Sequence, residues 1–597
     1  MKKFLSTVLS VIIICFVLPL NISAENEADK QFIELFNERL ALDATVYYPT
    51  YMQLYFFKDP VKYGVENTFD GFYGNYPKSL DEIEVIADEL DAKLKSLDSS
   101  AMSEQYAYLH KALIDIYNEE ENDEDTDEGY EETVESVINI PHFMLGTDLS
   151  SDLHFEGYTA ILEDFGSWAD EYEKVLSESS EGSDTYLFYA EIARQVAADE
   201  NRPILKIITD NIDNYGGDKE ALIARANTAY EEEFIPAYES VAELLEAAAE
   251  EAVEAPPTLG IGVNYEEFWA EELELEASPD EVFEFLTEYY FSIAARVEEI
   301  RNGPDFWDKV DKMSATDYTG DEIFEMIYEK YGDVYPISPE DLPETGFMPS
   351  YLGSGASGRC FPPRIDDPFT SRFFLTEGLF ENNSTGFLTI AHEGYPGHYY
   401  DSYHLGKLFP NTDLPFHFRD MMLGEGWADY TGLLALGAIY EDSEIAEYAA
   451  LSNILAQIDS AVFELGLYHC KWTFDEFKAF YETLPGFGEF TEEDYLGFKS
   501  FYESSIYSQV PYTYAPLKLF EMRQKLIDRG DFDELSFHTF ILDHSYMTFE
   551  DAQELFYETY FPENAEETPN PETGNSNGYA VLIVLTTAAM ILSRRRR

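Results

Sequence analysis

Apolar residues recur at helical spacing along most of the chain, and acidic residues fill many of the positions between them. From Asp29 to about Ala252 long stretches of this kind alternate with acidic breaks, as in residues 79–97 and 220–251. Apolar positions that recur every three or four residues predict amphipathic helices. Segments with strand-like alternation are few. The pattern therefore predicts a mainly α fold.

The second half of the chain continues the helical pattern after a break. Pro256, Pro257 and the glycines of 260–262 mark that break, and residues 265–300 again predict a helix. Residues 346–369 are rich in Gly, Ser and Pro and predict a long ordered loop, after which 372–375 is typical of a short edge strand. We therefore expect a large helical domain with a small β element beside a deep active-site cleft.

The N-terminus has the pattern of a secretory signal peptide over residues 1–24. Lys2 and Lys3 precede an apolar run, and Ile22, Ser23 and Ala24 offer small residues at a cleavage point. A buried first helix is the alternative, but the basic start and the polar residues that follow fit it less well. The sequence predicts an exported protein.

The C-terminal residues 570–597 have the three parts of a cell-wall sorting signal. The pentapeptide Asn-Pro-Glu-Thr-Gly at 570–574 is followed by an apolar stretch at 579–592 and a tail of four arginines. The apolar stretch is shorter than the ~20 residues of a spanning helix, so no permanent transmembrane helix is expected in the mature protein. The arrangement resembles a sortase substrate cleaved between Thr573 and Gly574. It predicts covalent attachment to the peptidoglycan of a Gram-positive cell wall.

Between the two ends, residues 25–560 are long enough for one large domain or two lobes, and 561–569 are typical of an acidic, proline-containing spacer. The net charge is −81, from 118 acidic and 37 basic residues, which argues against nucleic acid as a partner. Outside the signal peptide only Cys360 and Cys470 remain. They could form one disulfide, but they are too few for a cysteine-rich zinc site.

The chemistry of the chain is concentrated in residues 389–398, where His392 and His398 flank Glu393 and a Pro-Gly pair. Imidazole nitrogens and carboxylates are common zinc ligands. On a straight helix a spacing of six would point the two rings about 120° apart. Pro396 lacks an N–H, and its ring clashes with the carbonyl four residues back, so the helix must kink or bulge here. Both histidines could then reach one metal.

A third ligand is available in a predicted second helix over residues 420–439. Glu425 follows His398 by 27 residues, and Asp429 lies four further on, on the same helical face. Asp429 could accept the free ring N–H of a ligating histidine and so fix its tautomer. Glu393 would then be free to act as the general base for a metal-activated water.

These residues resemble a known family. The motif His-Glu-x-x-Pro-Gly-His at 392–398, followed by Glu-Gly-Trp-Ala at 425–428, is similar to the signature of bacterial domain-of-unknown-function family 885, which is grouped with zinc peptidases of the gluzincin type. Residues 511–514 and 532–538 also look like family landmarks, and the resemblance runs from about 29 to 560. The family commonly has a segment Asp-x-Gly-x-His. The matching residues 464–468 are Glu-Leu-Gly-Leu-Tyr, and the histidine follows one position later, at His469. The resemblance implies a helical metallopeptidase fold similar in kind to angiotensin-converting enzyme and thermophilic carboxypeptidases.

Several other residues are candidates for the site. Tyr512, Tyr514 and His538 could stabilise an oxyanion, although aromatic residues are more often part of the core. Arg359 and Arg364 could hold a substrate carboxylate, or could form structural ion pairs. We assign Glu393, Tyr512 and His538 as catalytic candidates, and Arg359 and Tyr514 as substrate-binding candidates. Histidines 404, 417 and 544 are interpreted as ordinary surface or core residues.

The sequence thus predicts a cell-surface peptidase with one Zn²⁺ per chain, held by His392, His398 and Glu425, and with carboxypeptidase-like action as one form of its activity. Two alternatives stay open. One is a zinc hydrolase of another amide or an ester, since the same metal chemistry serves all of these. The other is a wall-anchored binding protein whose metal site is not catalytic.

Overall fold

The computed structural model describes residues 26–562, apart from 47–48, 63, 66–68, 75–79, 121–133, 180–181, 253–263, 314–317, 354–356, 362, 368–371, 379–382, 411, 413, 486–487, 505–507 and 531. The predicted signal peptide, the sorting signal with Thr573 and Gly574, and nearly all of the spacer lie outside the described residues. The fold is mainly helical with one small sheet, as predicted. No helix in the described part is both long enough and apolar enough to cross a bilayer.

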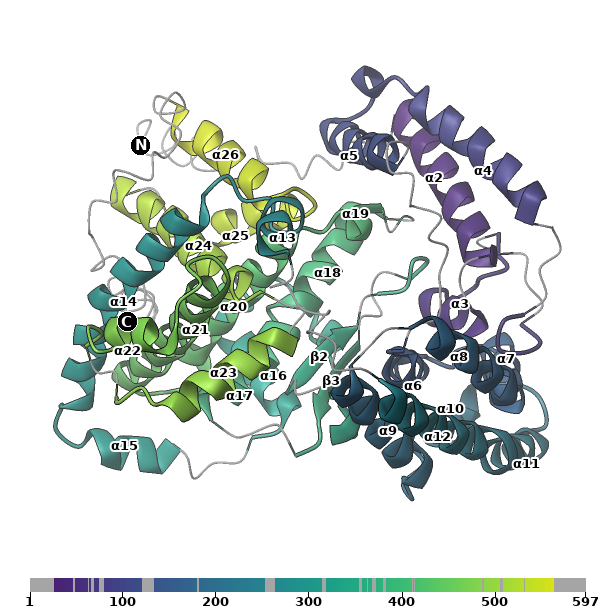
Figure 1. The fold of residues 1–597 in the computed structure, drawn as a ribbon. Coiled ribbons are helices and arrows are strands. Elements are labelled where there is room, and N and C mark those ends of the chain that lie inside the picture. Colours follow the sequence, from purple (N-terminus) through teal and green to yellow (C-terminus); the bar gives the residue numbers. More distant parts are fainter. Residues whose placement is uncertain are drawn as a thin grey trace.

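The first half of the chain forms a helical lobe, drawn in purple and blue in Figure 1, which we call the N-terminal lobe. Its helices are α2 (Glu27–Val46), α3 (Thr50–Phe56), α4 (Leu80–Lys95), α5 (Glu104–Glu120), α6 (Ser136–Gly146), α7 (Asp152–Glu163), α8 (Phe165–Glu178), α9 (Ser183–Ala198), α10 (Pro203–Asn211), α11 (Lys219–Ala229) and α12 (Ile235–Glu251). A π-helical segment, η3 (Tyr230–Phe234), joins α11 to α12, so the helix predicted over 220–251 is present with a bulge in it.

The second half forms the C-terminal lobe on the other side of the molecule (Figure 1). Its helices are α13 (Tyr265–Glu271), α14 (Pro279–Arg301), α15 (Phe306–Met313), α16 (Gly320–Tyr331), α17 (Ser384–Glu393), α18 (His398–Leu408), α19 (Leu414–His417), α20 (Met421–Ile439), α21 (Ser443–Tyr468), α22 (Phe474–Tyr481), α23 (Glu492–Ser504), α24 (Val510–Arg529), α25 (Glu534–Asp543) and α26 (Phe549–Tyr560). The predicted helix 265–300 is two helices, because Ser278 caps a new helix that begins at Pro279.

The sheet contains β1 (Thr345–Met348), β2 (Gly358–Phe361) and β3 (Arg372–Thr376) in the order β1-β3-β2. β3 pairs in parallel with β1 and antiparallel with β2. The strand predicted over 372–375 is therefore present, but its assignment as an edge strand is wrong. The segment predicted as a long loop supplies β1 and β2, and these two strands pair with β3 on either side.

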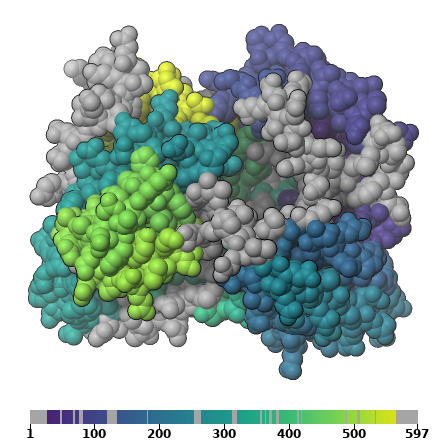
Figure 2. Space-filling model, in the orientation of Figure 1, coloured from purple at the N-terminus to yellow at the C-terminus, as the bar shows by residue number. Residues whose placement is uncertain are grey.

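The sheet lies between two hydrophobic cores. Phe373 and Leu375 of β3 belong to the core of the C-terminal lobe, whereas Met348 and Phe361 belong to the core of the N-terminal lobe. Successive side chains of a strand point to opposite faces, which explains this division. Figure 2 shows the surface recessed between the two lobes. The short strands thus contact both lobes.

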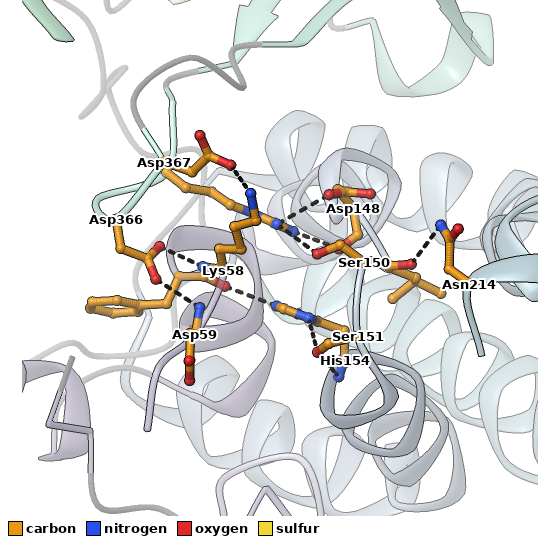
Figure 3. Close-up of polar contacts among 12 residues, drawn as sticks. Lys58, Asp59, Asp148, Ser150, Ser151, His154, Asn214, Asp366 and Asp367 are labelled. Carbon is orange, nitrogen blue, oxygen red and sulfur yellow. Dashed lines mark hydrogen bonds and ion pairs between the residues drawn. The ribbon is translucent and has the colours of Figure 1, made fainter. Parts of the chain in front are cut away.

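The loop after β2 is anchored to the N-terminal lobe by polar contacts (Figure 3). The carboxylate of Asp366 accepts the backbone N–H groups of Lys58 and Asp59, at 2.6 and 2.7 Å. Lys58 also pairs with Asp367. Next to Lys58, the His154 ring forms a hydrogen bond of 2.9 Å with the carbonyl oxygen of Phe57. These contacts hold the end of β2 beside α3.

Candidate metal centre

His392 and Glu393 are the last residues of α17, and His398 is the first residue of α18. The break predicted between the two histidines is present, and it includes a cis peptide bond between Tyr395 and Pro396. Gly397 is required by close packing, since a Cβ there would lie 1.8 Å from the carbonyl oxygen of His392. A backbone that turns this tightly brings the second helix back toward the end of the first.

The two imidazole rings face one carboxylate oxygen. Their centroids are 4.6 Å apart and their planes are nearly perpendicular, at 86°. Oε2 of Glu425, on α20, lies 3.2 Å from Nε2 of His392 and 3.1 Å from Nε2 of His398. The first turn of α20 is held by its N-cap, Asp420, whose side chain accepts the Leu423 N–H.

This donor set fits a zinc ion. Zinc bonds nitrogen and oxygen at about 2.0–2.1 Å in tetrahedral sites, which places neighbouring ligand atoms roughly 3.3 Å apart. Both distances from Glu425 to the ring nitrogens are close to this value. Glu393 also lies near, because His392, Glu393 and His398 offer ligand atoms within 4.8 Å of one another. These three residues form a group that could hold a metal ion, and two carboxylates are in reach of it.

Asp429 and Gln457 determine how the His392 ring is oriented. Nδ1 of His392 lies 3.1 Å from Oδ1 of Asp429, and the amide of Gln457 on α21 donates to Oδ2 of the same carboxylate at 3.0 Å. A carboxylate acceptor at Nδ1 favours the tautomer that carries the hydrogen there, so Nε2 keeps a lone pair for a metal. No motif pointed to Gln457, which reaches the site only through the packing of α21 on α20.

His398 is oriented differently. Nη2 of Arg419 lies 3.2 Å from its Nδ1, and Arg419 also pairs with Asp401, whose other oxygen accepts the hydroxyl of Ser545 at 2.7 Å. A guanidinium only donates, so in this arrangement Nδ1 accepts and the hydrogen lies on Nε2, toward Glu425. Coordination through Nε2 would move that hydrogen to Nδ1 and leave Arg419 paired with Asp401 alone.

Glu393 is held by the sheet. Its Oε2 accepts the backbone N–H of Cys360 in β2 at 2.8 Å. A Cβ at Gly358 would lie 3.5 Å from Cγ of Glu393, which shows how closely β2 runs along α17. The sequence did not indicate this contact of Cys360 with the group, because a backbone N–H carries no side-chain signal. Cys360 and Cys470 are both free thiols, so the disulfide is absent.

Burial and close charges shift the pKa values of the group. Burial alone lowers the pKa of His392, but Asp429 and Glu425 outweigh it and the pKa lies well above its usual value. Burial raises the pKa of Glu425, yet the two histidines reverse this and hold the pKa far below its usual value. For Asp429 burial prevails and the pKa is raised. Without a metal, positive charge on the His392 ring compensates the buried Glu425.

Of the three aromatic candidates, the structure brings Tyr512 to the group. Its ring stacks on His392 with a centroid distance of 5.9 Å. Tyr514 points elsewhere, packing on Phe285 at 5.1 Å. His538 is fully buried, and its Nε2 bonds the hydroxyl of Tyr430 at 3.0 Å. Tyr514 and His538 therefore lie in packed surroundings outside the group.

The two arginine candidates lie on the face of the sheet toward the N-terminal lobe. Arg359, in β2, acts electrostatically on Tyr55 and His142 of that lobe. Arg364 is fully buried and donates to the carbonyl of Asp148 at 2.6 Å and to its carboxylate at 3.2 Å. Arg364 forms the structural ion pair that was one of its two predicted roles. Neither arginine joins the group around His392.

Glu464 is a buried acid that positions α24, the helix carrying Tyr512. Its carboxylate accepts the hydroxyls of Tyr265 and Ser508, at 2.9 and 2.6 Å, and the backbone N–H of Gln509 at 2.6 Å. Ser508 in turn accepts the Val510 N–H at 3.1 Å, at the first residue of α24. Glu464 thus fixes the start of α24 against α21 and α13.

This arrangement predicts a pH-dependent contribution to stability. Burial raises the pKa of Glu464 to about 7, although its hydrogen bonds oppose the shift. Between the ordinary carboxyl pKa and 7 the unfolded chain loses a proton that the folded chain keeps, so stability falls as pH rises through this window. The contribution is up to ~3 kcal/mol. Glu464→Gln should match the native chain near pH 5 and exceed its stability at pH 8.

Urea unfolding of both chains from pH 5 to 8 measures this difference. Glu266→Gln, on the exposed face of α13, is the matched control and should follow the native pH profile. Parallel stability curves for Glu464→Gln and the native chain would show that Glu464 does not titrate in this range.

Comparison with known proteins gives a family and a fold. Among solved structures, a proposed lipoprotein from Colwellia psychrerythraea matches with a TM-score of 0.62 and 16% identity, covering 89% of this chain and 100% of its own. A proposed lipoprotein of unknown function from Shewanella oneidensis matches with a TM-score of 0.56 and 15% identity, covering 89% and 99%. At such identities the likeness establishes the fold alone. No curated protein matches. The model of the family "Bacterial protein of unknown function (DUF885)" matches residues 74–550, and the chain therefore belongs to that family.

Proposed function

We propose that this protein is an exported zinc-dependent peptidase. One observation carries the proposal: the Nε2 atoms of His392 and His398 lie within 3.2 Å of one oxygen of Glu425, with a second carboxylate, Glu393, beside them. Two imidazoles and a carboxylate that converge in this way form the ligand set of many catalytic zinc sites, and leave one position open.

In the proposed site His392, His398 and Glu425 hold one Zn²⁺, and Asp429 with Gln457 orients His392. When bound, the zinc would supply Lewis-acid polarisation of the substrate carbonyl and would lower the pKa of a water molecule. The neutral Nδ1–H tautomer of His392, favoured by Asp429, leaves Nε2 available as a ligand.

Glu393 is the proposed general base. The Cys360 N–H binds its Oε2, so the carboxylate is held at one oxygen while the other is left for the proton of the attacking water. Glu393 would pass that proton to the leaving amine. Tyr512 stacks on His392, and its hydroxyl is the proposed donor to the oxyanion that develops at the scissile carbonyl.

The same proposal includes the location of the protein. The N-terminal pattern supports export, the C-terminal pattern supports attachment to a Gram-positive cell wall by a sortase, and both structural relatives carry the description of lipoproteins. An exported peptidase with a strongly acidic surface would act on extracellular peptides. Residues 25–560 would form its catalytic domain, with the two lobes on either side of the sheet.

Metal analysis and a peptide-library digest test the function directly. The purified chain should contain one zinc, cleave peptides from the library, lose this activity on treatment with a chelator and regain it with zinc. Mass spectrometry of the products would show whether single C-terminal residues are removed. A chain that holds zinc without cleaving any peptide would favour either of the two alternatives, a hydrolase of other amides or esters or a binding protein.

A further inference from the structure

Arg372, the first residue of β3, places its guanidinium between the sheet and the N-terminal lobe. Its Cζ lies 4.7 Å from the centre of the Tyr55 ring in α3, and a Cβ at Gly146 of α6 would be 3.8 Å from the same atom. Arg372 pairs with Phe361 of β2, and Phe361 belongs to the core of that lobe. The side chain therefore lies on the opposite face of the sheet from Phe373, which packs in the C-terminal lobe.

The polar atoms around Arg372 are hydrogen-bond donors that lack acceptors. Nε, Nη1 and Nη2 of Arg372 each expose less than 1 Å² and have no partner among the described residues. The same holds for the hydroxyl of Tyr55 and for Nε of Arg364. Buried polar groups are nearly always paired, so several orphaned donors at one place require an explanation. An acceptor that is not a side chain of this protein would satisfy them.

Three arginines gather around Tyr55, although the chain as a whole is strongly negative. Arg359, Arg364 and Arg372 all act electrostatically on Tyr55. Asp148 lies near Arg372 but pairs with Arg364. Asp366 and Asp367 also act on Arg364, so no carboxylate pairs with Arg372 among the described residues. The neighbouring His142 adds no compensating charge, because burial, together with Arg359, lowers its pKa to about 4. A buried guanidinium that no carboxylate pairs with is unfavourable.

We propose that Arg372, with the Tyr55 hydroxyl and Nε of Arg364, binds one small inorganic anion between the sheet and the N-terminal lobe. An anion accepts from all of these donors and neutralises the excess charge. The very low exposure of the Arg372 nitrogens favours a small ion over a peptide carboxylate. Such an ion would link β3 to α3. Because β3 pairs with β2, the ion would also stabilise β2, whose Cys360 N–H binds Glu393.

Thermal unfolding at constant ionic strength tests this site. The full chain is freed of small anions and titrated with sodium chloride against sodium gluconate, and in a second arm with sodium phosphate, which distinguishes a halide from an oxyanion. In the native chain the midpoint should rise by about 1 °C for each tenfold increase in the binding anion above its Kd. Arg372→Met, which keeps the apolar stem, should show no such rise.

Arg194→Met is the matched control, because Arg194 is half-exposed and pairs with Glu246 on the surface. This variant should keep the native response. An unchanged midpoint of the native chain in both salts, or an equal rise in Arg372→Met, would overturn the proposal. If Arg372→Met does not fold, crystals of the native chain soaked in bromide and, separately, in selenate decide the matter. Anomalous density beside Arg372 in either soak supports the site, and its absence in both contradicts it.

Discussion

Replacement of Glu393 by Gln is expected to abolish hydrolysis while leaving one zinc on each chain. Gln keeps the length of the side chain and a carbonyl oxygen that can accept the Cys360 N–H, so the local fold should be retained. It cannot accept a proton from the attacking water. Loss of a general base typically lowers the rate by 10²–10⁴-fold, and we expect at least this loss in kcat with little change in KM.

The measurement combines zinc content with turnover of a peptide found in the library digest. Glu239→Gln, on the exposed face of α12, is the control and should retain native turnover and zinc. Undiminished turnover of Glu393→Gln would exclude this residue as the base. Loss of zinc in the same variant would point instead to Glu393 as a metal ligand, a role that its distance from the two histidines also permits.

The features that the sequence predicted well are those set by local pattern. Helical periodicity gave the mainly α fold, and Pro396 with Gly397 predicted the break that separates α17 from α18. The spacing of Glu425 and Asp429 placed both on one face of α20, and both contact histidine nitrogens. The helical periodicity, the Pro-Gly break and the four-residue spacing on α20 are each set by residues near in the chain or by a backbone restriction of the residue itself.

The features that escaped prediction depend on contacts between distant segments. Gln457 and Cys360 touch the site through the packing of α21 and β2, and neither lies in a motif. β3 was expected at an edge because nothing in its own residues shows that strands will pair on both sides of it. Tyr514 and His538 lie in segments that resemble family landmarks, yet the first packs on Phe285 and the second is enclosed by aromatic rings. A residue in a motif-like segment can thus serve the core.

Replacement of Glu425 by Ala is the second change with a large expected effect, and it should release the zinc. The variant removes the single oxygen that both Nε2 atoms approach, so two ligands remain where a stable site needs three. Removal of a residue that only orients a ligand costs about 10–100-fold in metal affinity, and loss of a ligand should cost more than 100-fold. Zinc titration with a competing chelator measures the affinity, and activity should fall in proportion to the bound metal.

Asp429→Asn provides the matched comparison, because it disturbs the orientation of His392 without removing a ligand. Its zinc affinity should fall within the 10–100-fold range and lie between those of the native chain and Glu425→Ala. Circular dichroism would establish that each variant is folded. If Glu425→Ala kept its zinc while Glu393→Gln lost it, the two carboxylates would exchange their proposed roles. If both variants kept the metal, the third ligand would have to be a residue other than Glu425.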